Sequence, residues 1–131
     1  MNYLETKATK GVRGFLSPNI SLNPSSGECT LSGRSLMSNP RLFYTPVFDW
    51  LDEYENSNST ELNWHIHITY FNSSSKKIFI TLFKRLYELQ QKSRQQIKVN
   101  WYCLEEDTDL KDEVEEMSKE SGFKIHILPK E

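Results

Sequence analysis

Three consecutive serines, Ser73, Ser74 and Ser75, followed by Lys76 and Lys77, are the residues of this chain most suited to chemistry. They follow an alternating apolar segment and precede a helical pattern, so we expect them where a strand ends and a helix begins. The free N–H groups and the dipole at a helix start favour an anion. A phosphate on a serine there would be favoured by the helix end and both lysines, and would add about −1.5 to −2 charges. The simpler alternative is that Ser73 or Ser74 only caps the helix.

Three histidines offer a second kind of chemistry. His65 and His67 lie two positions apart on the polar face of a predicted strand, and His126 lies on the polar face of the last predicted strand. If those strands are neighbours, the three imidazoles could hold a Zn²⁺ ion, as in a small metal-dependent hydrolase. No carboxylate or cysteine has a matching spacing on that face, so the pattern favours three half-exposed histidines without a ligand role.

The other reactive side chains have simpler interpretations. The chain contains no glycine-rich phosphate loop, no Gly-x-Ser-x-Gly elbow and no His-Glu-x-x-His pair. Cys103 stands beside acidic residues, which disfavour its thiolate. A group of acids could recruit a hard cation but more simply caps a third helix: Asp107, Asp109, Asp112 and Glu113. We therefore expect a protein that is not an enzyme and that holds no metal or cofactor.

Composition limits the class of protein. A length of 131 residues gives one domain's worth of chain, and 12% aromatic residues are too many for a disordered one. No apolar run is long enough to span a bilayer, and the polar N-terminus lacks the apolar stretch of a secretory signal. Two cysteines make no disulfide framework. We expect a soluble, cytoplasmic domain without membrane insertion.

Charge is nearly balanced over the whole chain but is segregated along it. Sixteen basic and eighteen acidic residues give a net charge of −2, which disfavours nucleic-acid binding. Residues 76–98 carry seven basic side chains and one acid, whereas residues 105–120 carry nine acids and two lysines. Two opposed patches suit oriented docking onto other proteins. The alternative is two solvated helix faces of opposite sign.

Hydrophobic periodicity and turn signals predict the elements that position these residues. Residues 1–14 show weak periodicity and are expected to be a flexible lead-in, with a single domain over 15–131. The predicted strands are 19–22 and 28–32, which form a hairpin, then 61–70, 97–103 and 124–128. The predicted helices run from about 39 to 55, from the serines to about 92, and from 108 to 121, ending at Gly122.

The alternation within the strands predicts which side of the sheet is buried. In the strand 61–70, one face carries the side chains of Leu62, Trp64, Ile66, Ile68 and Tyr70. The order β-β-α-β-α-β-α-β with right-handed crossovers gives an α/β fold: a mixed sheet with helices mainly on one face and a polar face on the other. This architecture resembles the STAS domains of anti-sigma-factor antagonists.

Several motifs also resemble one family over about residues 17–128. They are Gly33-Arg34-Ser35, then Phe43 with Pro46-Val47-Phe48-Asp49-Trp50-Leu51, then Tyr70-Phe71-Asn72-Ser73-Ser74-Ser75-Lys76, and Trp101-Tyr102 with acids after it. In this order they are similar to the motifs of the SiaC family of regulatory phosphoproteins. The junction motif is fairly specific, whereas the Pro-Val-x-x-Trp-Leu helix alone is a weak signal.

The resemblance implies a protein switch. In that family a partner kinase, SiaB-like, phosphorylates the threonine of an Asn-Thr-Ser-Ser segment, and a PP2C-like phosphatase removes the phosphate. The unmodified protein binds and activates a diguanylate cyclase, which raises cyclic di-GMP and promotes biofilm formation. Carried over by position, the phosphorylated residue is Ser73, and the switch segment that binds partners consists of Tyr70, Asn72, Ser74, Ser75 and Lys76.

One segment departs from the family pattern. Where the family has Gly-Glu-Ser-Tyr-Pro-Glu-Asn, this chain has Gly33-Arg34-Ser35-Leu36-Met37-Ser38-Asn39, without the two acids. If that segment touches a partner, the partner is expected to differ or to carry a different charge. A second interpretation of the same serine chemistry is an anti-anti-sigma protein that captures an anti-sigma kinase. A third is a structural interaction domain in which Ser73 only caps a helix.

Overall fold

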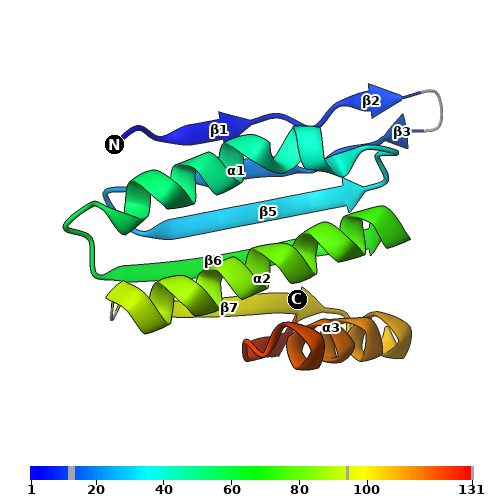
Figure 1. Cartoon of the computed structure of the whole chain (residues 1–131). Helices are drawn as coiled ribbons and strands as arrows, with labels where there is room; N and C mark the ends of the chain where they lie inside the picture. Colours follow the sequence, from blue (N-terminus) through cyan, green and yellow to red (C-terminus); the bar gives the residue numbers. More distant parts are fainter. Residues whose placement is uncertain (12–13, 94, 131) are drawn as a thin grey trace.

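The described part of the chain is built on a six-stranded sheet covered on one face by three helices (Figure 1). The structure is a computed structural model, and it describes residues 1–11, 14–93 and 95–130. The helices are α1 (Pro40–Glu55), α2 (Ser73–Ser93) and α3 (Thr108–Ser121). None of the helices in these residues is long and apolar enough to cross a membrane.

The sheet has the strand order β1-β4-β5-β6-β7-β8. Its strands are β1 (Leu4–Thr6), β4 (Asn19–Leu22), β5 (Glu28–Ser35), β6 (Glu61–Phe71), β7 (Gln96–Cys103) and β8 (Ile125–Pro129). The first three strands pair antiparallel, and β5 to β8 are parallel. The predicted mixed sheet and the order of elements from Asn19 onward are therefore confirmed. The prediction was possible because alternation and turn signals mark these strands in the sequence.

The core lies between the helices and one face of the sheet. On β6 the side chains of Leu62, Trp64, Ile66 and Ile68 are buried, as their alternation predicts. The helix α2 contributes Phe79, Phe83, Leu86 and Leu89 from one side, again at helical spacing. The acids at the start of α3 include its cap: Asp107 accepts a hydrogen bond from the backbone N–H of Leu110, and the helix ends at Gly122 with φ of 75°.

The N-terminal segment contains strands that the sequence analysis missed. β1 pairs with β4, where Leu4 lies opposite Leu22 and packs against the core. The backbone carbonyl of Asn2 also accepts a hydrogen bond from the indole of Trp50. A second ladder joins β2 (Lys10–Gly11) to β3 (Gly14–Phe15), and residues 12 and 13 of the expected lead-in lie outside the described residues. Strands of two or three residues are too short to show an alternating pattern.

The predicted direction of Tyr70 is wrong, and the cause is a bulge. Gly33 pairs with Ile68 but Arg34 pairs with Tyr70, so Thr69 is an extra residue in β6. Because the extra residue shifts the alternation by one position, Tyr70 is 61% exposed while Phe71 turns toward the core. The ring of Phe71 packs against those of Phe79 and Trp101.

Candidate functional site

The serines lie where β6 ends and α2 begins, at the edge of the sheet formed by the carboxyl ends of its parallel strands. We call residues 70–76 the serine junction. The last residues of β5 lie beside it, because Arg34 pairs with Tyr70 and Ser35 with Phe71. In open α/β sheets this edge is where binding residues usually gather.

Asn72 fixes the start of α2. Its side-chain oxygen accepts a hydrogen bond from the backbone N–H of Ser75 at 2.9 Å, and its side-chain nitrogen donates to the carbonyl of Met37 at 3.0 Å. The capping residue is therefore Asn72, and the expectation that Ser73 or Ser74 caps the helix is wrong. The same side chain joins the junction to the segment 33–39.

The three serines of the junction have different surroundings. Ser73 is exposed, Ser74 is half-buried and Ser75 is fully buried. The Ser75 hydroxyl lies 2.7 Å from that of Ser35, which in turn lies 2.8 Å from the hydroxyl of Tyr44 on α1. Ser75 is thus tied into the core, whereas the hydroxyl of Ser73 faces solvent. A modifying enzyme can reach Ser73 without opening the fold.

Ser35 and Tyr44 are site residues that the sequence analysis did not assign. Together with Ser75 they form a buried chain of hydroxyls that joins β5, α1 and α2. Burial raises the pKa of Tyr44 well above its usual value, so the phenol stays protonated and neutral. No local signal marks such a chain, because it joins residues up to 40 positions apart in the sequence.

Lys76 belongs to the contact between α2 and α3. Its ammonium group lies 2.9 Å from a carboxylate oxygen of Glu113 and 3.1 Å from one of Glu116. The hydrogen bond to Glu113 raises the pKa of Lys76 above its usual value. Lys77, the next residue, is exposed. Of the two lysines, Lys77 is therefore the one whose charge faces solvent beside Ser73.

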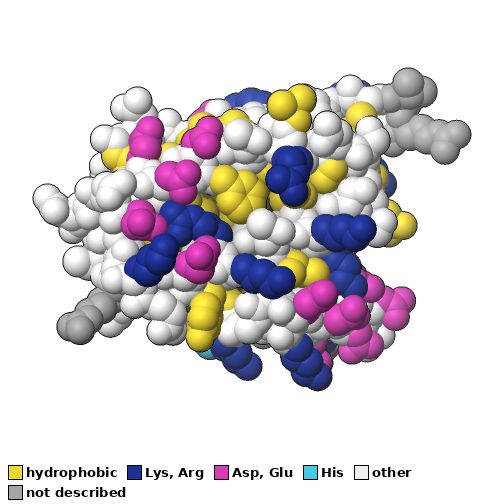
Figure 2. Space-filling model, in the orientation of Figure 1, with side chains coloured by type: hydrophobic (Ala, Val, Ile, Leu, Met, Phe, Trp, Pro, Cys, Tyr) yellow, Lys and Arg dark blue, Asp and Glu magenta, His cyan; other side chains and the backbone are white. Residues whose placement is uncertain are grey.

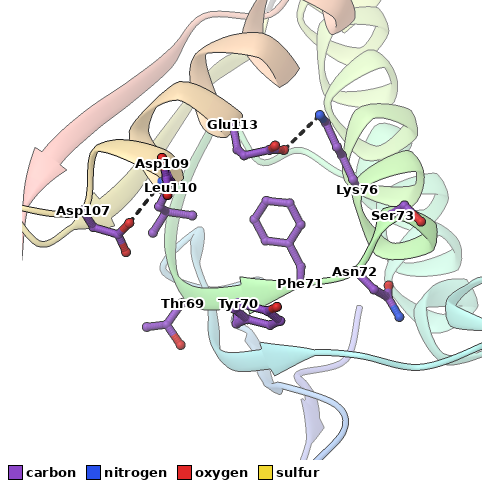
Figure 3. A pocket seen from close by; sticks show the side chains of 10 residues that line it. All are labelled: Thr69, Tyr70, Phe71, Asn72, Ser73, Lys76, Asp107, Asp109, Leu110 and Glu113. Carbon is purple, nitrogen blue, oxygen red and sulfur yellow. Dashed lines mark hydrogen bonds and ion pairs between the residues drawn. The ribbon is translucent and has the colours of Figure 1, made fainter.

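An open hollow of about 470 Å³ lies between the serine junction and the start of α3 (Figure 3). Phe71 points into it from β6, and Lys76 reaches along its rim to Glu113. Its α3 wall is formed by Asp107, Asp109, Leu110 and Glu113. Three of the acids that follow β7, Asp107, Asp109 and Glu113, therefore face the junction, as their place after a neighbouring parallel strand leads one to expect.

Arg34 and Tyr70 form the opposite side of the junction. The guanidinium carbon of Arg34 lies 5.8 Å from the centre of the exposed Tyr70 ring, which is cation–π range. The segment that departs from the family pattern is therefore in direct contact with the serine junction through both Arg34 and Met37.

The histidines lie on the sheet face opposite the helices. The two ring nitrogens of His65 lie 2.9 Å from the hydroxyl of Tyr102 and 2.9 Å from a carboxylate oxygen of Glu28. His67 stacks on Tyr102 at 4.4 Å between ring centres, and His126 pairs in register with Asn100. Among the described residues no group of three His, Cys, Asp or Glu side chains is placed to hold a metal ion.

The two cysteines are buried and free. Burial raises the pKa of both Cys29 and Cys103, and the nearby carboxylate of Asp107 adds to the effect on Cys103. A high pKa keeps a thiol protonated and unreactive, as the acidic neighbours of Cys103 predict.

These features define a mixed α/β domain with one helical layer, whose exposed serine, aromatic and charged residues gather at one strand–helix junction. Within this class the chain belongs to one family: the family described as SiaC family regulatory phosphoprotein matches residues 2–130. The resemblance drawn from the sequence motifs is thereby confirmed.

Solved structures agree on the fold. Apo-SiaC from Pseudomonas aeruginosa is similar with a TM-score of 0.82 and 21% identity, over 98% of this chain and 99% of that one. SiaC in the crystal structure of the diguanylate cyclase SiaD in complex with its activator SiaC, from the same organism, has a TM-score of 0.83 and 20% identity, over 97% and 99% of the chains. A search of curated proteins finds no match.

Proposed function

We propose that this chain is a non-enzymatic, cytoplasmic phospho-switch that controls a diguanylate cyclase. A SiaB-like kinase phosphorylates Ser73, a PP2C-type phosphatase removes the phosphate, and the unmodified chain binds and activates the cyclase. Membership of a family of regulatory phosphoproteins supports this proposal. So does the similarity in fold to SiaC from Pseudomonas aeruginosa, which is an activator in complex with the cyclase SiaD.

The observation that carries the proposal is the exposure of Ser73. The hydroxyl lies at the first residue of α2, and Asn72 rather than Ser73 caps the helix. The Ser73 hydroxyl is therefore not needed to cap the helix. Ser75 is fully buried, so a kinase cannot phosphorylate it in the folded chain.

The proposed mechanism is a change of charge at the centre of a docking surface. A phosphate adds about −1.5 to −2 charges at the start of α2, where the helix dipole and Lys77 favour it. The modified surface has a different charge and a larger desolvation cost for a partner. A difference of about 1.4 kcal/mol in binding free energy is already a tenfold change in affinity.

Intact-mass measurement and peptide mapping of the protein isolated from its own cells test the proposal. We expect a single phosphate on Ser73, which is lost in S73A and kept in the matched variant S74A. The S73A protein should still stimulate cyclic di-GMP synthesis by the cyclase that co-purifies with it. A phosphate found on Ser74 alone would refute the assignment to Ser73, and capture of a sigma-factor regulator in place of a cyclase would refute the effector.

A further inference from the structure

The exposed surface next to Ser73 on the helical layer combines basic and apolar side chains. Over residues 40–46 of α1 and 73–84 of α2, the exposed positions carry no acid. They are Arg41, Leu42, Thr45, Pro46, Ser73, Lys77, Thr81 and Lys84. We call these residues the basic face. The next exposed acids are Asp49 on α1 and Glu88 on α2, three and four residues beyond it.

The two helices form one continuous surface. Figure 1 shows α1 and α2 side by side on the same face of the sheet, with both N-terminal ends toward the same edge. The rings of Tyr44 and Phe79 meet edge to face at 5.7 Å, which joins the N-terminal halves of the helices. In the C-terminal halves, Arg85 lies 2.9 Å from carboxylate oxygens of both Asp52 and Glu55.

Charge separates the basic face from its surroundings. Figure 2 shows Lys and Arg side chains with apolar ones across the middle of the helical layer, and acidic side chains gathered over α3 and toward the C-terminal end of α1. The basic face has three formal positive charges, from Arg41, Lys77 and Lys84. Leu42, in the first turn of α1, is 75% exposed, the largest exposed fraction among the large apolar side chains of the described residues.

We infer that the cyclase docks on the basic face. The docking segment of the cyclase is acidic and carries an apolar side chain that packs against Leu42. This inference rests on the proposed function. Opposite charges across an interface favour correct encounters and disfavour wrong partners. An exposed leucine among cations fits a protein partner that presents an apolar side chain better than it fits a nucleic acid.

The position of Ser73 supplies the direction of the switch. Ser73 and Lys77 are four positions apart on α2, so their side chains are neighbours on one side of the helix. A phosphate of about −1.5 to −2 charges would lower the charge of the basic face from +3 to about +1. An acidic partner would then lose most of its attraction, whereas a basic partner would gain from the phosphate. An acidic docking segment therefore makes phosphorylation an off-signal.

The test measures how tightly two charge-reversed variants bind the cyclase that co-purifies with the wild-type chain. The variant K77E/K84E reverses the basic face, and the control K98E/K124E reverses two exposed lysines on β7 and beside β8. We expect K77E/K84E to bind the cyclase at least about tenfold more weakly and L42A to lose affinity as well, with the control unchanged. Raising ionic strength from about 0.1 M to about 1 M should weaken wild-type binding, because it shortens the Debye length from about 10 Å to about 3 Å.

The outcomes separate the inference from the proposed function. If the wild-type chain binds the cyclase and K77E/K84E binds equally well, the assignment of the docking surface is refuted and the proposed function is kept. If the wild-type chain binds no diguanylate cyclase, the proposed function fails and the inference with it. Tight binding of the chain to phosphatidylserine vesicles, lost in K77E/K84E, would assign the face to a membrane surface instead. Circular dichroism of each variant confirms that the fold is kept.

Discussion

The hydroxyl oxygens of Ser35 and Ser75 lie 2.7 Å apart in a buried hydrogen bond that joins the end of β5 to the first turn of α2. Ser35 belongs to the segment in which this chain departs from its family, and Ser75 belongs to the serine junction. The two segments therefore form one structural unit. A substitution in residues 33–39 can alter the junction, because this segment contacts Ser75, Asn72 and Tyr70.

Ser75 should matter for stability, and Ser73 should not. In S75A the buried hydroxyl of Ser35 loses one of its two partners, so we expect the free energy of unfolding to fall by about 1 kcal/mol. In S73A an exposed hydroxyl is removed, and the change should stay within about 0.5 kcal/mol. Chemical denaturation of both variants measures the difference. The structural role of Ser75 would be refuted if S73A were the less stable protein.

Asn72 has two roles that substitutions separate. N72A removes both the cap of α2 and the bond to Met37, and we expect a loss of about 1–2 kcal/mol in unfolding free energy. N72D keeps an oxygen for the backbone N–H of Ser75 but cannot donate to the Met37 carbonyl, so its loss should be smaller. Equal losses in N72A and N72D would mean that the bond to Met37, and not the cap, stabilises the junction.

Negative charge at Ser73 should stabilise the fold while it weakens docking. S73E places a carboxylate in the first turn of α2, where the helix dipole favours it by about 0.3–1 kcal/mol at low ionic strength. We expect a higher free energy of unfolding than in S73A, and a lower affinity for the cyclase. The opposite signs of these two effects distinguish a switch from general damage. A less stable S73E protein would contradict the favourable environment at the helix start.

His67 should make stability depend on pH in the mildly acidic range. Burial, aided by the positive charge of Lys130, lowers the pKa of His67 in the folded chain. The unfolded chain then takes up the proton first as the pH falls below the ordinary histidine pKa of about 6.5. The free energy of unfolding should therefore decrease from about pH 7 downward, and less steeply in H67Q. Denaturation curves at several pH values measure both slopes, and an unchanged slope in H67Q would show that another group is responsible.

Much of the fold could be predicted because its signals are local. The alternation of β6 and β7, the turn before β5 and the αL glycine after α3 each lie within a few residues. The position of Ser73 at the start of α2 follows from the same patterns. The family of the chain could be recognised because the motifs around these elements keep their order along the sequence.

The remaining features depend on contacts between distant residues. β1 is only three residues long and exists through its pairing with β4. Alternation alone placed Tyr70 on the buried face, because the bulge at Thr69 becomes visible only in the pairing with β5. The choice of Asn72 as the cap was hidden by three neighbouring serines, each of them a good capping residue. The hydroxyl chain of Ser35, Tyr44 and Ser75 joins three elements and has no pattern in any one of them.

The bulge at Thr69 lets β6 carry one more residue than β5 without turning Tyr70 inward. With Thr69 present, Tyr70 is presented outward and Phe71 is held inside. Deletion of Thr69 would make the pairing with β5 continuous, and alternation after Ile68 would still leave Tyr70 outward and Phe71 inside. The display of Tyr70 at the rim is therefore insensitive to a one-residue deletion at this position, which would remove only the side chain of Thr69.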